Sequence, residues 1–331
     1  MTPDGPGAGF GSGLRPNPVV DVHIHIFGGP SWRHQANVEG MSKLWARLIL
    51  WEGEQADPAY YVKTVEESWD PNGDRCIAQM DAAGIDISIM MPMDRALALG
   101  EGAISIDEEN RLCGEIARRH AGRLYSFCGV DPRRPNAVEI LRRGVTEYGL
   151  KGLKLYPPCG FYPNDPVCYR LYRECVELNV PVLIHTGYAV PPLKSKYAHP
   201  LHIDEVAADF PSLRIILGHA GMPHAWGTDA ISVAIYRPNV YLDMSLWYGW
   251  LSEAKLVETF ALLRDRVGCE RVCFGTDRTG ARPTEHLKDW VDTFRGLPEL
   301  GARYNQRFTQ QQVDQMLGLN ALGLLNLREA G

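Results

Sequence analysis

Two histidines near the amino terminus, His23 and His25, have the spacing that most directly suggests chemistry. They lie in the run 19–27, whose β-branched residues predict a strand that ends at Gly28 and Gly29. Side chains at positions i and i+2 of a strand project from the same face, so both imidazoles could bind one metal ion. The alternative interpretation is a chance pair of histidines, one buried and one at the strand end.

Three further side chains able to bind or work beside a metal each follow an apolar run and precede a small or turn-forming residue. They are His185, His219 and Asp277. Three neutral imidazoles and one carboxylate suit Zn²⁺ or a similar divalent ion, which in a catalytic site keeps one position open for water. The remaining histidine would then be free for proton transfer or oxyanion stabilisation.

These side chains meet only if the runs that carry them are neighbouring parallel strands. Most of the predicted strands are continuous apolar runs, as expected for strands buried on both faces. Eight alternating units predict an α/β fold, a (β/α)8 TIM barrel, whose catalytic residues gather at the carboxyl ends of the strands. The expected strands are 19–27, 85–92, 124–131, 152–157, 182–187, 213–221, 240–245 and 271–277, and the expected helices are 75–83, 107–120, 136–148, 165–178, 203–210, 224–236, 253–267 and 309–327.

The domain organisation predicted from composition is a flexible leader followed by one barrel. Residues 1–17 are rich in Gly and Pro, and residues 18–331 form the single domain, with an insertion at 30–74 directly after the first strand. We expect the insertion, which carries four tryptophans, to be a lid or pocket wall; packing against the outer helices is the alternative.

Composition narrows the class of partner. With 331 residues, a formal net charge of -6 and no run of Lys or Arg, the chain is not expected to bind nucleic acid. The start lacks the apolar core of a signal peptide and no stretch is long enough to span a bilayer. The eight cysteines contain no CxxC pair and are expected to be reduced thiols. A cytoplasmic enzyme acting on a small molecule is the resulting prediction.

The ordered set of motifs resembles the amidohydrolase superfamily, in particular the branch with aminocarboxymuconate-semialdehyde and resorcylate-type decarboxylases and several hydrolases. The resemblance covers about residues 18–325 and implies that His23, His25, His185 and Asp277 are metal ligands, with His219 as the catalytic histidine. In binuclear relatives a histidine at the His219 position is itself a ligand. From the ligand types we expect Zn²⁺, with Mn²⁺ as the alternative, and the resemblance to this branch implies a possible homodimer. The motifs are His23-x-His25, Lys154-Leu-Tyr-Pro157, Leu183-Ile-His185-Thr-Gly187, Gly218-His219-Ala-Gly221 and Phe274-Gly-Thr-Asp277.

Lys154 leaves three interpretations open. It shares a strand face with Tyr156, at the end of the run 152–157. Some members of the superfamily carbamylate a lysine on this strand to bridge two metals, in which case two ions would be bound. Lys154 could instead hold a substrate carboxylate beside a single ion, or simply extend to solvent. We favour substrate binding and one ion.

Four more residues are candidates for the substrate pocket. Tyr156 lies beside Lys154, and Arg278 could bind an acidic substrate or neutralise the surroundings of Asp277. His199 lies in the loop after the fifth strand, and Trp247 follows the seventh strand, where it could form an aromatic wall or pack at the barrel rim.

The leading functional hypothesis is a metal-dependent hydrolase of a small carboxylated or cyclic ester, lactone or amide. A metal-activated water would attack the carbonyl, with Asp277 or His219 moving the proton. The alternative is a metal-dependent non-oxidative decarboxylase or hydratase of an aromatic or muconate-type acid. A third possibility, a metal-free barrel used for binding or assembly, is disfavoured because polar groups buried without partners are costly.

Overall fold

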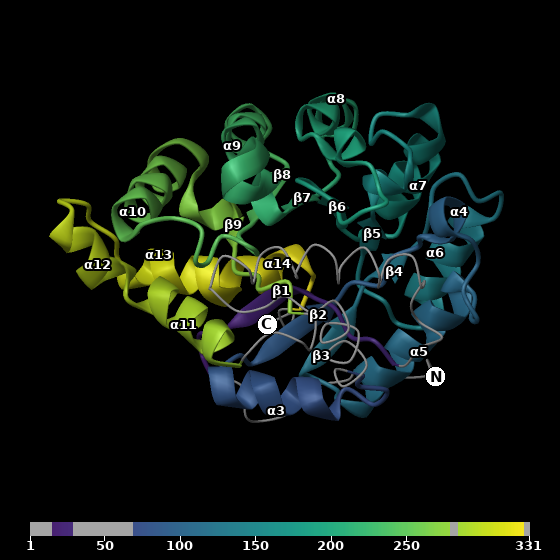
Figure 1. Cartoon of the computed structure of the whole chain (residues 1–331), viewed down its shortest axis with the longest axis horizontal. Coiled ribbons are helices and arrows are strands. Elements are labelled where there is room, and N and C mark those ends of the chain that lie inside the picture. The colour runs from purple at the N-terminus through teal and green to yellow at the C-terminus, as the bar shows by residue number, and fades with distance from the viewer. Residues whose placement is uncertain (1–14, 29–68, 279–283, 328–331) are drawn as a thin grey trace, which may run out of the picture.

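The structure, a computed structural model, describes residues 15–28, 69–278 and 284–327. Most of the predicted insertion and most of the leader therefore lie outside the described residues, and so do the roles expected of them. The remaining chain alternates strands and helices around a central ring of parallel strands (Figure 1).

The strands of the ring follow one another in sequence order, and every pair is parallel. The predicted strand 124–131 is present as two short strands, and it joins the strands on both sides: Phe127 N donates to Met90 O, and Cys128 N donates to Gly152 O. The strands are β1 (Val20–Ile24), β2 (Ile87–Met90), β3 (Leu124–Ser126), β4 (Cys128–Gly129), β5 (Leu153–Leu155), β6 (Val182–His185), β7 (Ile215–Gly218), β8 (Val240–Asp243) and β9 (Val272–Cys273).

Backbone hydrogen bonds join the last strand region to the first. Val22 N donates to Phe274 O at 3.0 Å, Asp277 N donates to His23 O at 2.8 Å, and His25 N donates to Arg278 O at 2.7 Å. When β3 and β4 are counted together as one strand, these bonds connect eight strands into a ring. The expected (β/α)8 barrel is confirmed.

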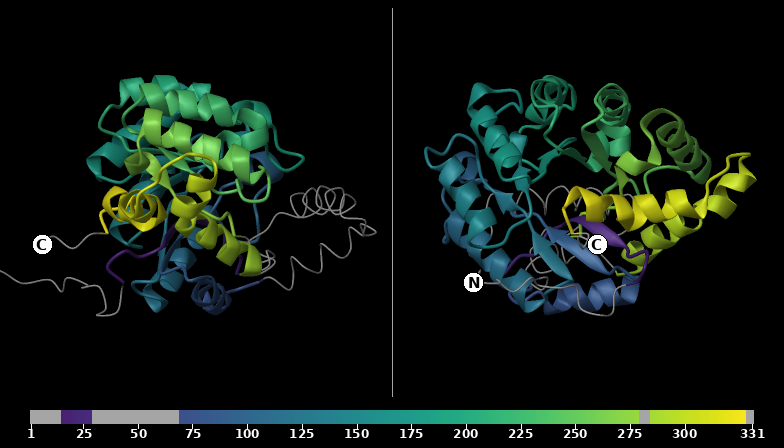
Figure 2. Two further views of the ribbon diagram at one scale, coloured as in Figure 1. Left: turned by 90° about the vertical axis from the view of Figure 1, so that its left-hand side faces the viewer. Right: turned by 180° about the vertical axis from the view of Figure 1, so that it is seen from behind.

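Helices cover the outside of the ring, as the views in Figure 2 also show. Each predicted helix has a counterpart, and three helices, α4, α11 and α12, were not predicted. The spacing of Leu287, Trp290, Val291 and Phe294, all buried, is that of one apolar helix face. The helices with predicted counterparts are α3 (Asp74–Ala83), α5 (Ile106–Arg119), α6 (Ala137–Thr146), α7 (Pro166–Glu177), α8 (Leu201–Asp209), α9 (Gly227–Tyr236), α10 (Glu253–Leu262), α13 (Gln310–Asp314) and α14 (Asn320–Leu324); the additional ones are α4 (Ala96–Leu99), α11 (Thr284–Arg295) and α12 (Leu297–Arg303).

The apolar core has two parts. The larger lies where the strands meet the surrounding helices, and the smaller joins residues of β1, β2, β6, β7 and β9 to α14. Val20, Ile87 and Ile216 in the smaller part stand at the first or second position of their strands, so α14 covers the amino-terminal end of the barrel (Figure 1). The opposite, carboxyl-terminal end is left for the polar residues.

Two expectations from composition can be compared with this fold. All eight cysteines are buried and free. Within the described ranges, we find no helix with the length and apolarity needed to cross a bilayer.

Candidate metal centre

A local irregularity of β1 sets the direction of the two amino-terminal histidines. The pairing of β1 with β2 shifts register between Asp21 and Ile24. Val22 belongs to the smaller core beside α14, whereas Ile24 packs in the larger core against the helices. Such a bulge re-aims the side chains that follow it. His23 and His25 are both buried, with ring centroids 5.2 Å apart.

Each of these histidines uses Nδ1 to bond an oxygen and turns Nε2 towards the other. His23 Nδ1 lies 2.7 Å from Asp243 Oδ2, and His25 Nδ1 lies 2.8 Å from the carbonyl oxygen of Met91. Burial lowers the pKa of both imidazoles, so both are neutral. A carbonyl only accepts hydrogen bonds, so His25 carries its proton on Nδ1, and the carboxylate of Asp243 assigns the same tautomer to His23. Both Nε2 atoms therefore present lone pairs.

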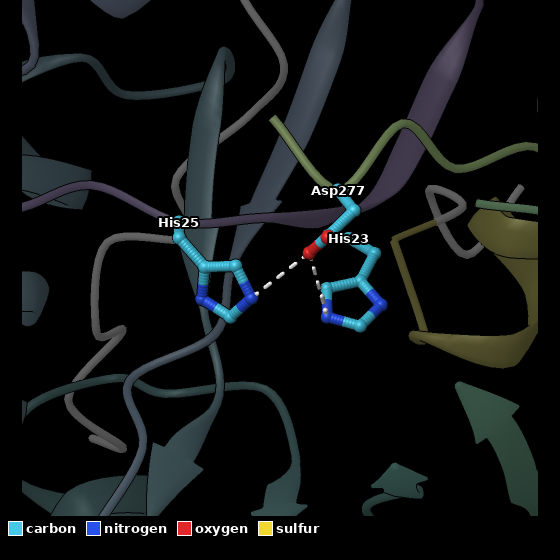
Figure 3. Close-up of side chains that lie close together, drawn as sticks. All are labelled: His23, His25 and Asp277. Atoms are coloured by element: carbon cyan, nitrogen blue, oxygen red, sulfur yellow. Dashed lines mark ion pairs between the residues drawn. The ribbon is translucent and has the colours of Figure 1, made fainter. Parts of the chain in front are cut away.

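Asp277 brings a carboxylate to these two lone pairs (Figure 3). Its Oδ1 lies 3.1 Å from His25 Nε2 and 3.8 Å from His23 Nε2. The backbone of Asp277 has a φ of 54°, a left-handed conformation that residues other than glycine adopt at a cost of about 1–3 kcal/mol. Its N–H bond to His23 O holds it there. His23 Nε2, His25 Nε2 and Asp277 Oδ1 therefore converge as three electron-pair donors. In the tautomer assigned to His25, no proton lies between its Nε2 and Asp277.

Asp243, at the end of β8, holds several of these groups in place. Its Oδ2 accepts from His23 Nδ1, from His219 N at 3.1 Å and from Ser245 Oγ at 2.7 Å. His23, His219 and Asp243 also lie close enough together to suggest a second cation site. Both oxygens of Asp243 already accept hydrogen bonds, three at Oδ2 and one from Ser245 N at Oδ1, so we assign Asp243 to orienting His23 instead.

His185 and His219 stand on the adjoining strand ends. Their ring centroids are 4.8 Å apart, and the His219 ring stacks on that of His23 at 4.6 Å. His185 is 5 % exposed, and its Nε2 has no hydrogen-bond partner in the described ranges. Burial lowers the pKa of both, to about 3 for His219. A buried ring nitrogen without a partner fits a ligand position.

The donor set fits one divalent cation. His23 Nε2, His25 Nε2 and Asp277 Oδ1 lie within 4.8 Å of one another. Two acceptors as close as His25 Nε2 and Asp277 Oδ1 repel each other unless a cation or proton lies between them. Nitrogen and carboxylate ligands of this kind suit Zn²⁺ or Mn²⁺.

A cavity of about 120 Å³ opens beside this cluster. It is lined by predicted metal or catalytic residues, namely His25, His185, His219 and Asp277, and by Lys154, Tyr156 and Arg95. Lys154 is fully buried, and burial lowers its pKa to about 7, partly offset by the charges of Asp277 and Asp243. Its Nζ donates to His23 Nε2 at 3.0 Å, so Lys154 lies at the centre of the site.

The other three candidates for substrate binding lie outside this cavity. Arg278 points to α3, where its Nε donates to Gln79 Oε1 at 2.6 Å. Trp247 donates from Nε1 to His219 O at 2.9 Å and so supports the backbone of His219. The ring of His199 packs 4.9 Å from that of Trp226. None of the three lines the cavity described above, whereas Lys154 and Tyr156 do.

Sequence reasoning missed Asp243, Ser245 and Arg95. Asp243 ends β8 and Ser245 follows two residues later, so the signal that identified His185 and His219, a polar residue after an apolar run, could have found both. Arg95 lies five residues beyond Met90, the end of β2, and no pattern in the sequence distinguishes it from a loop arginine.

Comparison with known proteins decides the family. The sequence profile of the amidohydrolase family matches residues 20–327, which is nearly the whole chain. The chain belongs to the amidohydrolase family. The predicted superfamily is therefore confirmed.

Among individual proteins, this amidohydrolase is 27% identical over 306 residues to 2-keto-4-carboxy-3-hexenedioate hydratase of Sphingobium sp., covering 80% of this chain and 84% of the relative. Two solved structures share the fold. One is 5-carboxyvanillate decarboxylase of Novosphingobium aromaticivorans, complexed with manganese (TM-score 0.65, 17% identity, 94% and 96% of the two chains). The other is 4-oxalomesaconate hydratase of Rhodopseudomonas palustris (TM-score 0.56, 18% identity, 93% and 95% of the two chains).

Proposed function

We propose that this amidohydrolase is a metal-dependent lyase that adds water to, or removes it from, a small unsaturated polycarboxylic acid. The observation that carries the proposal is the convergence of His23 Nε2, His25 Nε2 and Asp277 Oδ1 beside a cavity that also contains the buried amine of Lys154. The similarity to a hydratase of a carboxylated hexenedioate supports this choice of reaction and of substrate class.

His23, His25, His185 and Asp277 would hold the ion. When bound, a divalent ion supplies Lewis-acid polarisation of a substrate oxygen. Zn²⁺ is our first choice and Mn²⁺ the second, since the related fold of 5-carboxyvanillate decarboxylase was solved with manganese. With the ion on His23 Nε2, Lys154 Nζ would give up its present bond to that nitrogen, and its ammonium form would hold a substrate carboxylate.

His219 would move the proton. The hydroxyl of Ser245 donates its single hydrogen to Asp243 Oδ2, so it accepts from His219 Nδ1 at 2.8 Å. This arrangement leaves His219 Nε2 unprotonated in a residue that lines the cavity. During hydration this nitrogen would take a proton from water as the carbon–oxygen bond forms, and the protonated His219 would return that proton to the neighbouring carbon of the double bond.

Decarboxylation is the second candidate, because the same cavity and cationic side chains would also hold an aromatic acid. Hydrolysis, the reaction that the sequence motifs favoured, would use the same ion. That reaction stays a prediction. No feature of the described residues favours an acyl substrate over an unsaturated acid, and the relative with the named hydratase activity favours the latter. A homodimer in the cytoplasm likewise stays a prediction.

Product analysis distinguishes the three reactions. Protein loaded with Zn²⁺ or Mn²⁺ is incubated with 2-keto-4-carboxy-3-hexenedioate, and the products are followed by ultraviolet absorbance and mass spectrometry. Hydration is expected, seen as loss of the conjugated absorbance and gain of one water. Release of CO₂ would establish the decarboxylase instead. Cleavage of an ester or lactone panel, with neither hydration nor CO₂ release, would overturn the proposal and restore the hydrolase.

A further inference from the structure

Arg95 is a buried cation without a matching anion. It directly precedes α4, is 6 % exposed, and lines the cavity together with Lys154 and Asp277. Its Nε has no hydrogen-bond partner among the described residues, and its Nη2 lies 3.5 Å from the sulfur of Met93, which is a weak acceptor. Burying a guanidinium in this state costs free energy that a bound anion would recover.

The acids nearest to Arg95 are committed to other arginines. Asp94, its neighbour in sequence, accepts from both Nε and Nη2 of Arg134 and from the backbone N–H of Asp131. Asp131 in turn pairs with Arg133. No carboxylate in the described ranges lies within ion-pair distance of the Arg95 guanidinium, because the acids around it are paired with Arg133 and Arg134.

The charges that line the cavity are correspondingly unbalanced. Asp277 is the single carboxylate among its described lining residues, against the guanidinium of Arg95 and the amine of Lys154. The Arg95 guanidinium lies 5.8 Å from the centre of the Tyr156 ring, which places it beside the wall that Tyr156 forms. Asp277 faces the histidines, so it does not neutralise Arg95.

We infer that Arg95 binds a second carboxylate of the substrate, distinct from the one held at Lys154, and so selects diacids over monoacids. This inference rests on the proposed function, because it presumes that an acid occupies the cavity. A guanidinium can bind a carboxylate through two parallel N–H bonds, which fixes the orientation as well as the position of the substrate. Arg95 is thus a specificity-determining residue.

Binding of matched acids tests the inference without turnover. trans,trans-Muconate and sorbate share a six-carbon diene and differ in that one terminal carboxylate of muconate is a methyl group in sorbate; fumarate and crotonate form a shorter pair. Each acid is titrated calorimetrically into metal-loaded wild type and into Arg95→Leu, Arg95→Lys and Arg118→Leu. Arg118 is exposed on α5, so its variant controls for the loss of one positive charge.

Wild type is expected to prefer at least one diacid over its matched monoacid. Arg95→Leu should weaken binding of that diacid by about 10–100-fold and leave its monoacid within about threefold. Arg95→Lys should give an intermediate loss, because an ammonium keeps the charge but not the two-pronged geometry. Arg118→Leu should bind like wild type. Thermal unfolding and metal content of each variant establish that it is folded and loaded.

Three results would overturn the inference. Equal weakening of diacid and monoacid in Arg95→Leu would assign Arg95 to the first carboxylate or to the stability of the cavity. If both acids bind and Arg95→Leu has no effect on either, the role inferred for Arg95 is wrong, while the proposed function is unaffected. Binding of neither acid to wild type would overturn the proposed function and this inference together.

Discussion

Asp243 Oδ2 and His23 Nδ1 lie 2.7 Å apart, although the two residues are 220 positions apart in sequence and belong to β8 and β1. This contact determines which nitrogen of His23 faces Asp277. An outer carboxylate that orients a ligand histidine also raises the basicity of that ligand. The relationship assigns Asp243 to positioning a metal ligand and yields the first of four predictions.

Asp243→Asn should bind its metal about 10–100-fold more weakly than wild type, because the amide keeps the shape but not the charge that polarises His23. Competition with a chelator at constant pH measures the affinity. Asp289→Asn is the control, since Asp289 bonds the exposed Tyr248 hydroxyl at 3.0 Å and not a ligand. Unchanged affinity in Asp243→Asn would show that His23 is oriented without it.

Gly275 leaves the space that Asp243 occupies. A Cβ at this position would lie 2.1 Å from Asp243 Oδ1, so the carboxylate must move in Gly275→Ala. We expect a loss of about 1–3 kcal/mol in the free energy of unfolding together with weaker metal binding.

Gly318→Ala is the matched control, because its Cβ would meet Pro18 O at 1.8 Å at the opposite end of the barrel. It should be destabilised while its folded form keeps wild-type metal affinity. Chemical denaturation and chelator competition measure both quantities. Equal effects of the two variants on metal affinity would contradict the role given to Gly275.

His185→Ala should weaken metal binding by more than the roughly 10–100-fold expected when a residue outside the ligand set is changed. The reason is that it removes a proposed ligand, a nitrogen that has no other partner in the described residues. His199→Ala, which lies outside the cavity, should keep its metal. Elemental analysis after dialysis against a graded series of chelator concentrations separates the two. Retention of the ion by His185→Ala would exclude His185 as a ligand.

Asn110 supports the ring where β3 gives way to β4. Its amide donates to Gly129 O and accepts from Gly129 N, both at 2.9 Å, and all three groups are buried. Asn110→Ala leaves a buried donor and acceptor unsatisfied, so the free energy of unfolding should fall by about 2–4 kcal/mol.

Denaturant unfolding checks this loss. Glu115→Ala on the same helix removes an exposed ion pair with Arg111 and should change stability by less than about 1 kcal/mol. A similar small change in Asn110→Ala would mean that Gly129 finds other partners.

The pattern of residues along the chain was enough to predict the barrel and most of the residues that cluster at the carboxyl ends of its strands. Eight apolar runs alternating with amphipathic stretches specify parallel strands buried on both faces, and such strands bring His185, His219 and Asp277 to one end. The pair His23 and His25 followed from the two-residue period of a strand, which needs no knowledge of the rest of the fold.

Tertiary structure alone decided which groups act together. The bulge in β1 depends on its pairing with β2, and the tautomers of His23 and His25 depend on Asp243 and Met91, which are distant in sequence. Arg278 and Arg95 look alike in the sequence, yet one points to α3 and the other lines the cavity. Local patterns encode the direction of a strand face, whereas the partner of a buried charge is set by contacts between segments far apart in the chain.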